Sequence, residues 1–85
     1  MKYLLPGHER ADRFALLLKL TKLSSEPTVA ALTDHLVKGI DEATACAVNG
    51  VASSNFNRAL KRMNEIAGTV ERIKEIDWEK LKSVK

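Results

Sequence analysis

The sequence predicts an all-α protein, a small helical bundle of four to five helices that contains a helix-turn-helix. Apolar residues recur at steps of three and four along most of the chain. Hydrophobic residues make up 45% of the composition but aromatic residues only 5%, which favours helix packing over a β-sandwich. At 85 residues the chain is expected to form one domain, residues 1–85.

The N-terminal end is expected to lead into the first helix through a turn. Residues 1–7 form this turn segment, because Pro6-Gly7 is a turn-favouring pair. The first helix is predicted from His8 to Lys22, where Phe14 and Leu17 share one apolar face.

A second and a third helix are expected between breaks in the pattern. Ser25 is a candidate N-cap and proline is tolerated in a first turn, so the second helix is predicted over 26–38. Gly39 marks its end. Asp41 is a candidate cap for a third, short helix that runs to Val48.

The fourth helix is the longest predicted element. It begins with Ser53 or Ser54 as its cap and continues to Lys74. Asp77 is a candidate cap for a last short helix, which together with a frayed tail occupies residues 77–85. The apolar stripe of the fourth helix consists of Phe56, Leu60, Met63, Ile66 or Ala67, Val70 and Ile73.

Residues 41–62 have the pattern of a helix-turn-helix. Cys46 is a small residue where the first helix meets the second, and Gly50 can adopt the positive φ of a tight turn. Val51 follows as an apolar residue, and Phe56 is placed to insert from the second helix into the core. Because ordinary helical hairpins share this spacing, the pattern alone leaves a DNA-binding domain and a plain helical domain equally open.

The outer face at the start of the fourth helix is the candidate DNA-binding surface. Arginine can bind guanine in a bidentate manner, serine and asparagine can contact base edges or phosphates, and lysine can neutralise phosphates. The chain also has a net charge of +3. We predict contacts to double-stranded DNA from Ser53, Ser54, Asn55, Asn57, Arg58, Lys61 and Arg62.

Several segments, taken in order, resemble the PapB family of regulators of fimbrial adhesin operons. Residues 4–7, Leu-Leu-Pro-Gly, resemble a turn that precedes the first helix of these proteins. Residues 34–39, Asp-His-Leu-Val-Lys-Gly, are similar to the family's Asp-Tyr-Leu-Val-x-Gly. The resemblance covers residues 4–75, although Gly50 and Ala52 stand where the family tends to have larger polar residues. Its positions within the helix-turn-helix are Cys46, Phe56, Leu60 and Arg62.

This resemblance implies a sequence-preferring DNA-binding transcriptional regulator of an adhesin operon, which oligomerises along operator DNA and both activates and represses genes. The expected partners are double-stranded DNA and further copies of the chain. The expected location is the bacterial cytoplasm, in association with the nucleoid. The alternative is a helical protein–protein interaction module without direct DNA binding, because the stripe from Phe56 to Ile73 is also a candidate helix-pairing seam.

Several single residues have an ordinary structural interpretation beside a functional one. Cys46 is expected to be a small buried packing residue rather than a redox sensor. His8 and His35 are expected on the surface rather than as metal ligands, because neither has a Cys or His at ligand spacing. Trp78 is expected to close the core or to contact another copy. A solvated helix face with local ion pairs, rather than an acidic site, is the interpretation of Glu71, Glu75 and Glu79.

The sequence argues against several other classes of protein. We predict no enzyme activity, cofactor or metal site, because there is no Gly-rich phosphate loop, metal-ligand cluster or nucleophile elbow. No membrane span is expected, because the longest apolar run, Phe14 to Leu18, is far shorter than the roughly 20 residues required. No secretory signal is visible, and the single cysteine suits a reducing compartment.

Overall fold

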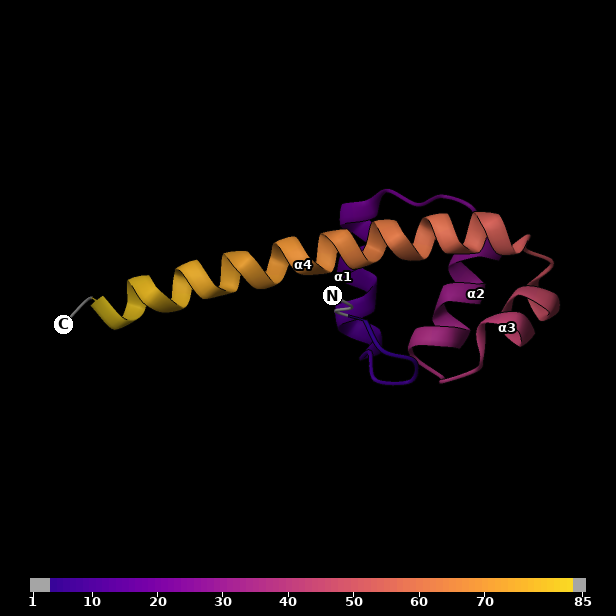
Figure 1. Ribbon diagram of the computed structural model, residues 1–85, viewed down its shortest axis with the longest axis horizontal. Helices are drawn as coiled ribbons and strands as arrows, with labels where there is room; N and C mark the ends of the chain where they lie inside the picture. Colours follow the sequence, from indigo (N-terminus) through magenta and orange to yellow (C-terminus); the bar gives the residue numbers. More distant parts are fainter. Residues whose placement is uncertain (1–3, 84–85) are drawn as a thin grey trace.

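The protein is described by a computed structural model that covers residues 4–83, with side chains as far as Lys80. Its four helices are α1 (Ala11–Thr21), α2 (Glu26–Leu36), α3 (Glu42–Asn49) and α4 (Ser53–Ser83). α2 packs on α3, and all three shorter helices pack on α4. They surround the N-terminal half of α4, while its C-terminal half projects alone (Figure 1). The prediction of an all-α fold is confirmed.

The segment before α1 crosses the C-terminal end of α2. The backbone N–H groups of Gly7 and Glu9 donate to the last carbonyl oxygens of α2, each at 3.1 Å. These bonds keep the chain in a non-helical path along α2. The predicted start of the first helix at His8 is therefore wrong, and α1 begins at Ala11.

Two glycines make this crossing possible. A Cβ atom added to Gly7 would lie 3.1 Å from the Cα atom of Gly39, and both residues have positive φ angles, 70° and 81°. Because the chain turns sharply here, α2 ends at Leu36 rather than at the predicted Lys38. Glycine suits both positions, because a Cβ atom at Gly7 would force the neighbouring backbone to shift by a few tenths of an ångström and a side chain at a positive φ adds strain.

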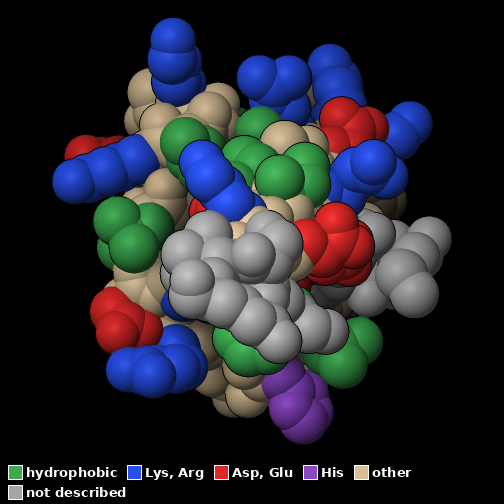
Figure 2. Space-filling view, turned by 90° about the vertical axis from the view of Figure 1, so that its left-hand side faces the viewer, with side chains coloured by type: hydrophobic (Ala, Val, Ile, Leu, Met, Phe, Trp, Pro, Cys, Tyr) green, Lys and Arg blue, Asp and Glu red, His purple; other side chains and the backbone are tan. Residues whose placement is uncertain are grey.

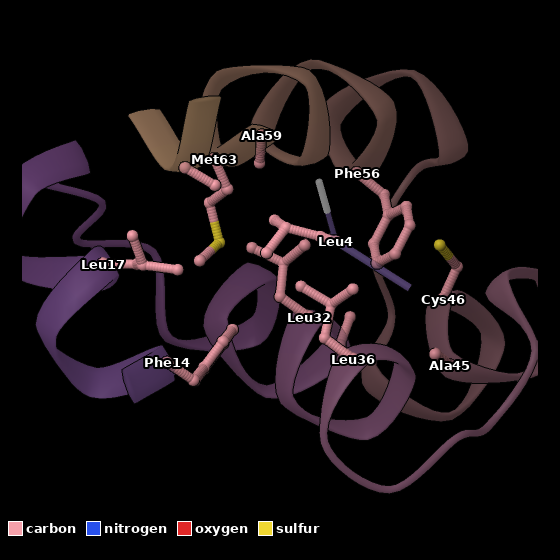
Figure 3. Packing of buried hydrophobic residues seen from close by; sticks show 12 residues of the cluster. Leu4, Phe14, Leu17, Leu32, Leu36, Ala45, Cys46, Phe56, Ala59 and Met63 are labelled. Atoms are coloured by element: carbon pink, nitrogen blue, oxygen red, sulfur yellow. The ribbon is translucent and has the colours of Figure 1, made fainter. Parts of the chain in front are cut away.

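The hydrophobic core joins all four helices around the N-terminal half of α4. Phe56 and Cys46 point toward one another where α3 meets α4, and Met63 points toward Leu17 of α1 (Figure 3). The predicted insertion of Phe56 and the packing role of Cys46 are confirmed. The largest fully buried side chains are Phe56, Leu32, Leu36 and Met63.

His35 lies in this core, which contradicts its predicted place on the surface. Its Nδ1 is 2.7 Å from the carbonyl oxygen of Ile40, and its ring meets that of Phe56 edge-on, with centroids 5.7 Å apart. Its Nε2 lies 3.7 Å from a carboxylate oxygen of Glu42. The sequence contained the signal, because Leu32 and His35 are three residues apart and so share one face of a helix.

α4 is one continuous helix of 31 residues, so the predicted separate helix after Asp77 is wrong. No Gly or Pro interrupts the chain between 69 and 83, and Asp77 has no break to cap. Trp78 is 62% exposed, so the expectation that it closes the core is also wrong. Its contact with another copy stays a prediction. Residues 84–85 of the predicted tail lie outside the described residues.

A charged cluster fastens α1 to α4. Arg13 donates to Glu9 at 2.6 Å and to Glu71 at 3.0 Å, and these carboxylates raise the pKa of Arg13, with the Glu9 hydrogen bond as the largest cause. Lys74 lies 3.5 Å from Glu71. The local ion pair expected at Glu71 is thus confirmed, while those of Glu75 and Glu79 stay a prediction.

None of the helices within residues 4–83 combines the length and apolarity needed to cross a membrane.

Candidate nucleic-acid interface

A tight turn joins α3 to α4. Gly50 ends α3 with a φ of 66°, as the sequence predicts. The N–H of Val51 donates to Cys46 O at 2.9 Å, and the N–H of Gly50 donates to Ala47 O at 3.4 Å. These are the two hydrogen bonds of a Schellman motif, and Val51 packs against the core as such motifs require. The direction in which α4 leaves α3 is therefore set by the backbone.

The two ends of α3 are held by side chains. Asp41 accepts hydrogen bonds from the Thr44 hydroxyl at 2.7 Å and the Thr44 N–H at 3.1 Å, which confirms its predicted role as a cap. These bonds lower the pKa of Asp41. At the other end, Asn49 donates to Asp34 of α2 at 2.9 Å, and this bond is the main cause of a lowered pKa at Asp34. α3 thus has a fixed position against α2.

The cap residue of α4 lies earlier in the chain than the sequence predicts. The carbonyl of Ala52 accepts from the N–H of Phe56 at 3.0 Å, so Ala52, rather than Ser53 or Ser54, occupies the cap position. The buried Phe56 and Ala59 fix the rotation of α4 about its axis. The opposite face is exposed and carries Ser54, Arg58, Lys61 and Arg62, with Asn55 and Asn57 on its two flanks and Ser53 exposed in the first turn.

This exposed face carries uncompensated positive charge. No Asp or Glu occurs between Glu42 and Glu65. Arg58 donates to the side-chain oxygen of Asn55 at 3.2 Å, an exposed contact between uncharged and charged partners. Within the part of the chain whose side chains are described, no ion pair involves the three cations Arg58, Lys61 and Arg62.

The face has a hollow on each side of α4. At about 100° per residue, Arg58 and Lys61 are separated by roughly 60° around the helix, so both lie on its outward side. Arg58 and Arg62 border a hollow of about 340 Å³ toward α1 and α2. Asn57 and Lys61 border another of about 330 Å³ toward the N-terminal segment and Glu42. The first hollow also includes residues that the sequence did not suggest for DNA binding, because they meet α4 only through the fold: Thr21, Leu23, Ser25 and Thr28.

The opposite end of the molecule has a different surface. Figure 2 views it along the long axis from the projecting end of α4 and shows Lys and Arg interspersed with Asp and Glu. This end therefore carries mixed charge, whereas the residues from 43 to 64 contain no acidic side chain at all. Because the start of α4 carries cationic side chains and no acidic ones, it is the surface better suited to bind a polyanion.

Comparison with known proteins identifies the family of the chain. The model of the PapB family, described as adhesin biosynthesis transcription regulatory protein, matches residues 1–76. The F1845 adhesin operon regulatory protein of Escherichia coli is 38% identical over 61 residues, which cover 72% of each chain. The AFA-III adhesin operon regulatory protein of Escherichia coli is 34% identical over 70 residues, covering 82% of this chain and 69% of that protein.

A solved structure shares the fold. The crystal structure of Escherichia coli FocB superposes with a TM-score of 0.81 at 23% sequence identity, over 86% of this chain and 83% of that one. Together with the family match and the two relatives, this similarity agrees with the family resemblance in the sequence and with a group of regulators rather than enzymes. The chain belongs to the PapB family of adhesin biosynthesis transcription regulatory proteins and is an adhesin operon transcription regulator.

Proposed function

We propose that this regulator binds double-stranded DNA in a sequence-preferring manner through the outer face at the start of α4, and that it does so as an oligomer on a fimbrial adhesin operon. Residues 41–62 act as its helix-turn-helix within a single domain. In this role the protein works in the bacterial cytoplasm, on the nucleoid.

The observation that carries the proposal is the acid-free, outward-facing group of cations on a helix whose rotation is fixed by its buried side. Arg58, Lys61 and Arg62 follow the turn directly and have no carboxylate partner among the side chains described. A surface held rigid before binding loses little conformational entropy when DNA arrives. The free N–H groups in the first turn of α4 add donors for a phosphate.

The residues are expected to divide into two roles. Arg58 and Asn57 suit base edges in a groove, because guanidinium and amide groups pair with guanine and adenine. Lys61 and Arg62 suit phosphates, which position the protein without reading sequence. Exposed Ser53 and Ser54 suit either role.

The test compares Arg58→Ala with the wild type on a duplex from the region upstream of the protein's own gene. Arg58 is exposed, so its removal is expected to change stability by no more than about 0.5 kcal/mol. Loss of a base contact is expected to weaken binding by about 1–3 kcal/mol and to relax specificity against a scrambled duplex. Lys61→Ala should weaken binding to both duplexes and reduce the salt slope by about one.

Arg10→Ala is the matched control, because it also removes one exposed cation, at the far end of α1. Equal losses in Arg10→Ala and Arg58→Ala would mean that only net charge matters. Unfolding of Arg58→Ala would make that residue structural. If the wild type binds no duplex even at low salt, the interaction module without DNA binding is the better account.

A further inference from the structure

The projecting half of α4 carries large apolar side chains that no described part of the chain covers. Ile73 is 52% exposed and Ile76 is 62% exposed. The last described ion pair between the bundle and α4 joins Arg13 to Glu71, and beyond it α4 stands alone (Figure 1).

These isoleucines belong to a second stripe that runs beside the one that builds the core. Only its first member, the half-buried Ile66, also packs against the core. Its steps alternate between three and four residues, the spacing of the a and d positions of a coiled coil. At 100° per residue its members lie within about 80° of one another, and the centre of the stripe is roughly 110° around the helix from the direction of Phe56 and Met63. The hydroxyl of Thr69 donates to Glu65 O at 3.1 Å, which leaves its methyl group for packing. The stripe consists of Ile66, Thr69, Ile73, Ile76 and Lys80.

We propose that this stripe pairs with the same stripe of a second copy in antiparallel orientation, with Ile73 of each copy against Ile76 of the other. The inference deepens the self-association in the proposed function and names its surface. The proposed pairing surface is not the stripe from Phe56 to Ile73 that the sequence offered as a helix-pairing seam. The buried residues of that stripe already pack in the core of the same chain.

The charge of Lys80 decides the orientation, because Arg72 has an acidic partner in either case. This partner is Glu79 of the second copy in an antiparallel pair and Asp77 in a parallel one. In the antiparallel pair, Arg72 of each copy flanks the seam opposite Glu79 of the other, so two favourable contacts form. In a parallel pair, Lys80 would meet Lys80 of the second copy inside the seam, where like charges repel. In the antiparallel pair, Lys80 instead packs its aliphatic stem beside Thr69 of the second copy and keeps its ammonium group in water.

The pairing is expected to be weak in free solution and stronger on DNA. The stretch from residue 66 to residue 80 is only about 21 Å long, so the seam is short. Its helix is already formed, because it continues from the packed half of α4, and pairing therefore needs little ordering. Two copies on neighbouring sites of one duplex have a high effective concentration, which favours the contact.

A charge-reversal series tests the pairing by sedimentation equilibrium of the full chain. Arg72→Glu and Glu79→Arg, each alone, are expected to raise the dissociation constant about tenfold, which corresponds to about 1.4 kcal/mol. The double variant Arg72→Glu/Glu79→Arg is expected to restore association. Disruption by Arg72→Glu with an unaffected Glu79→Arg would indicate parallel pairing and overturn the proposal, as would a wild type that stays monomeric at high concentration and on a two-site duplex.

Ile76→Glu tests the apolar part of the seam, with Leu16→Glu as its matched control. Leu16 of α1 is 61% exposed, close to the 62% of Ile76, but lies outside the stripe. Ile76→Glu is expected to weaken association at least as much as the single charge reversals, while Leu16→Glu leaves it unchanged. The reverse result would place the interface on α1 and overturn the proposal.

DNA binding separates this inference from the proposed function. On a duplex with one site, Ile76→Glu is expected to bind like the wild type, and on a duplex with two sites it is expected to lose cooperativity. Loss of single-site binding in Ile76→Glu would make the projecting half of α4 part of the DNA surface and overturn the pairing. Arg58→Ala is expected to lose DNA affinity and keep its self-association, so each proposal can fail alone.

Discussion

The crossing of Gly7 over Gly39 makes a quantitative prediction, with Gly50 as an internal reference. All three glycines have positive φ, where a residue with a side chain loses roughly 1–2 kcal/mol. A Cβ added to Gly50 meets nothing within 4 Å, so Gly50→Ala is expected to cost only that amount. A Cβ added to Gly7 would lie 3.1 Å from backbone of Gly39, and overpacking adds about 1–3 kcal/mol.

The measurement is urea unfolding of Gly7→Ala and Gly50→Ala, supported by thermal unfolding. Each kcal/mol is expected to lower the Tm by about 4–8 °C in a domain of this size. The double variant Gly7→Ala/Gly39→Ala is expected to be non-additive, because both new methyl groups would enter the same space. Equal losses for Gly7→Ala and Gly50→Ala would refute the reasoning, since the close approach would then have no energetic effect.

Three further predictions concern the core and the cap of α3. Phe56→Ala is expected to cost about 3–5 kcal/mol in urea unfolding, because Phe56 is only 1% exposed, and a loss below about 1 kcal/mol would contradict this. Asp41→Asn is expected to lower the Tm at pH 7 and to lower it progressively less as the pH falls below about 3.9. Hydrogen bonds from Thr44 lower the pKa of Asp41, so the contribution of its charge is present above the unfolded pKa and disappears as the pH falls through the folded value. A loss that does not change with pH would argue against a role of this charge. Cys46 is expected to react with a thiol reagent far more slowly in the folded protein than in urea, because burial raises its pKa, and equal rates would show that it is accessible.

Local chemistry made the turn region predictable from the sequence. Asp41 as a cap and Gly50 at positive φ follow from side-chain and backbone preferences that act within a few residues. The exposed face of α4 follows from the spacing of Phe56 and Met63, because burying one side of a helix exposes the other.

Long-range contacts were less accessible to sequence reasoning. The later start of α1 depends on hydrogen bonds from Gly7 and Glu9 to α2, which no local pattern reveals. At Asp77 the local signal is misleading for another reason: aspartate is a good cap residue, but no helix breaker precedes it, so the helix continues through this position. The hollow beside Arg58 and Arg62 depends on how the connection between α1 and α2 packs, and so belongs to the tertiary structure.

The continuity of α4 has a consequence for how copies are spaced on an operator. Arg62, on the proposed DNA face, and Ile76, on the proposed pairing face, are 14 positions apart on one uninterrupted helix, or about 21 Å. A flexible linker would let that distance and the angle between the faces vary, whereas a single helix holds both constant. Adjacent operator sites would then be accepted only at particular separations along the DNA, in phase with its helical turn of about 34 Å.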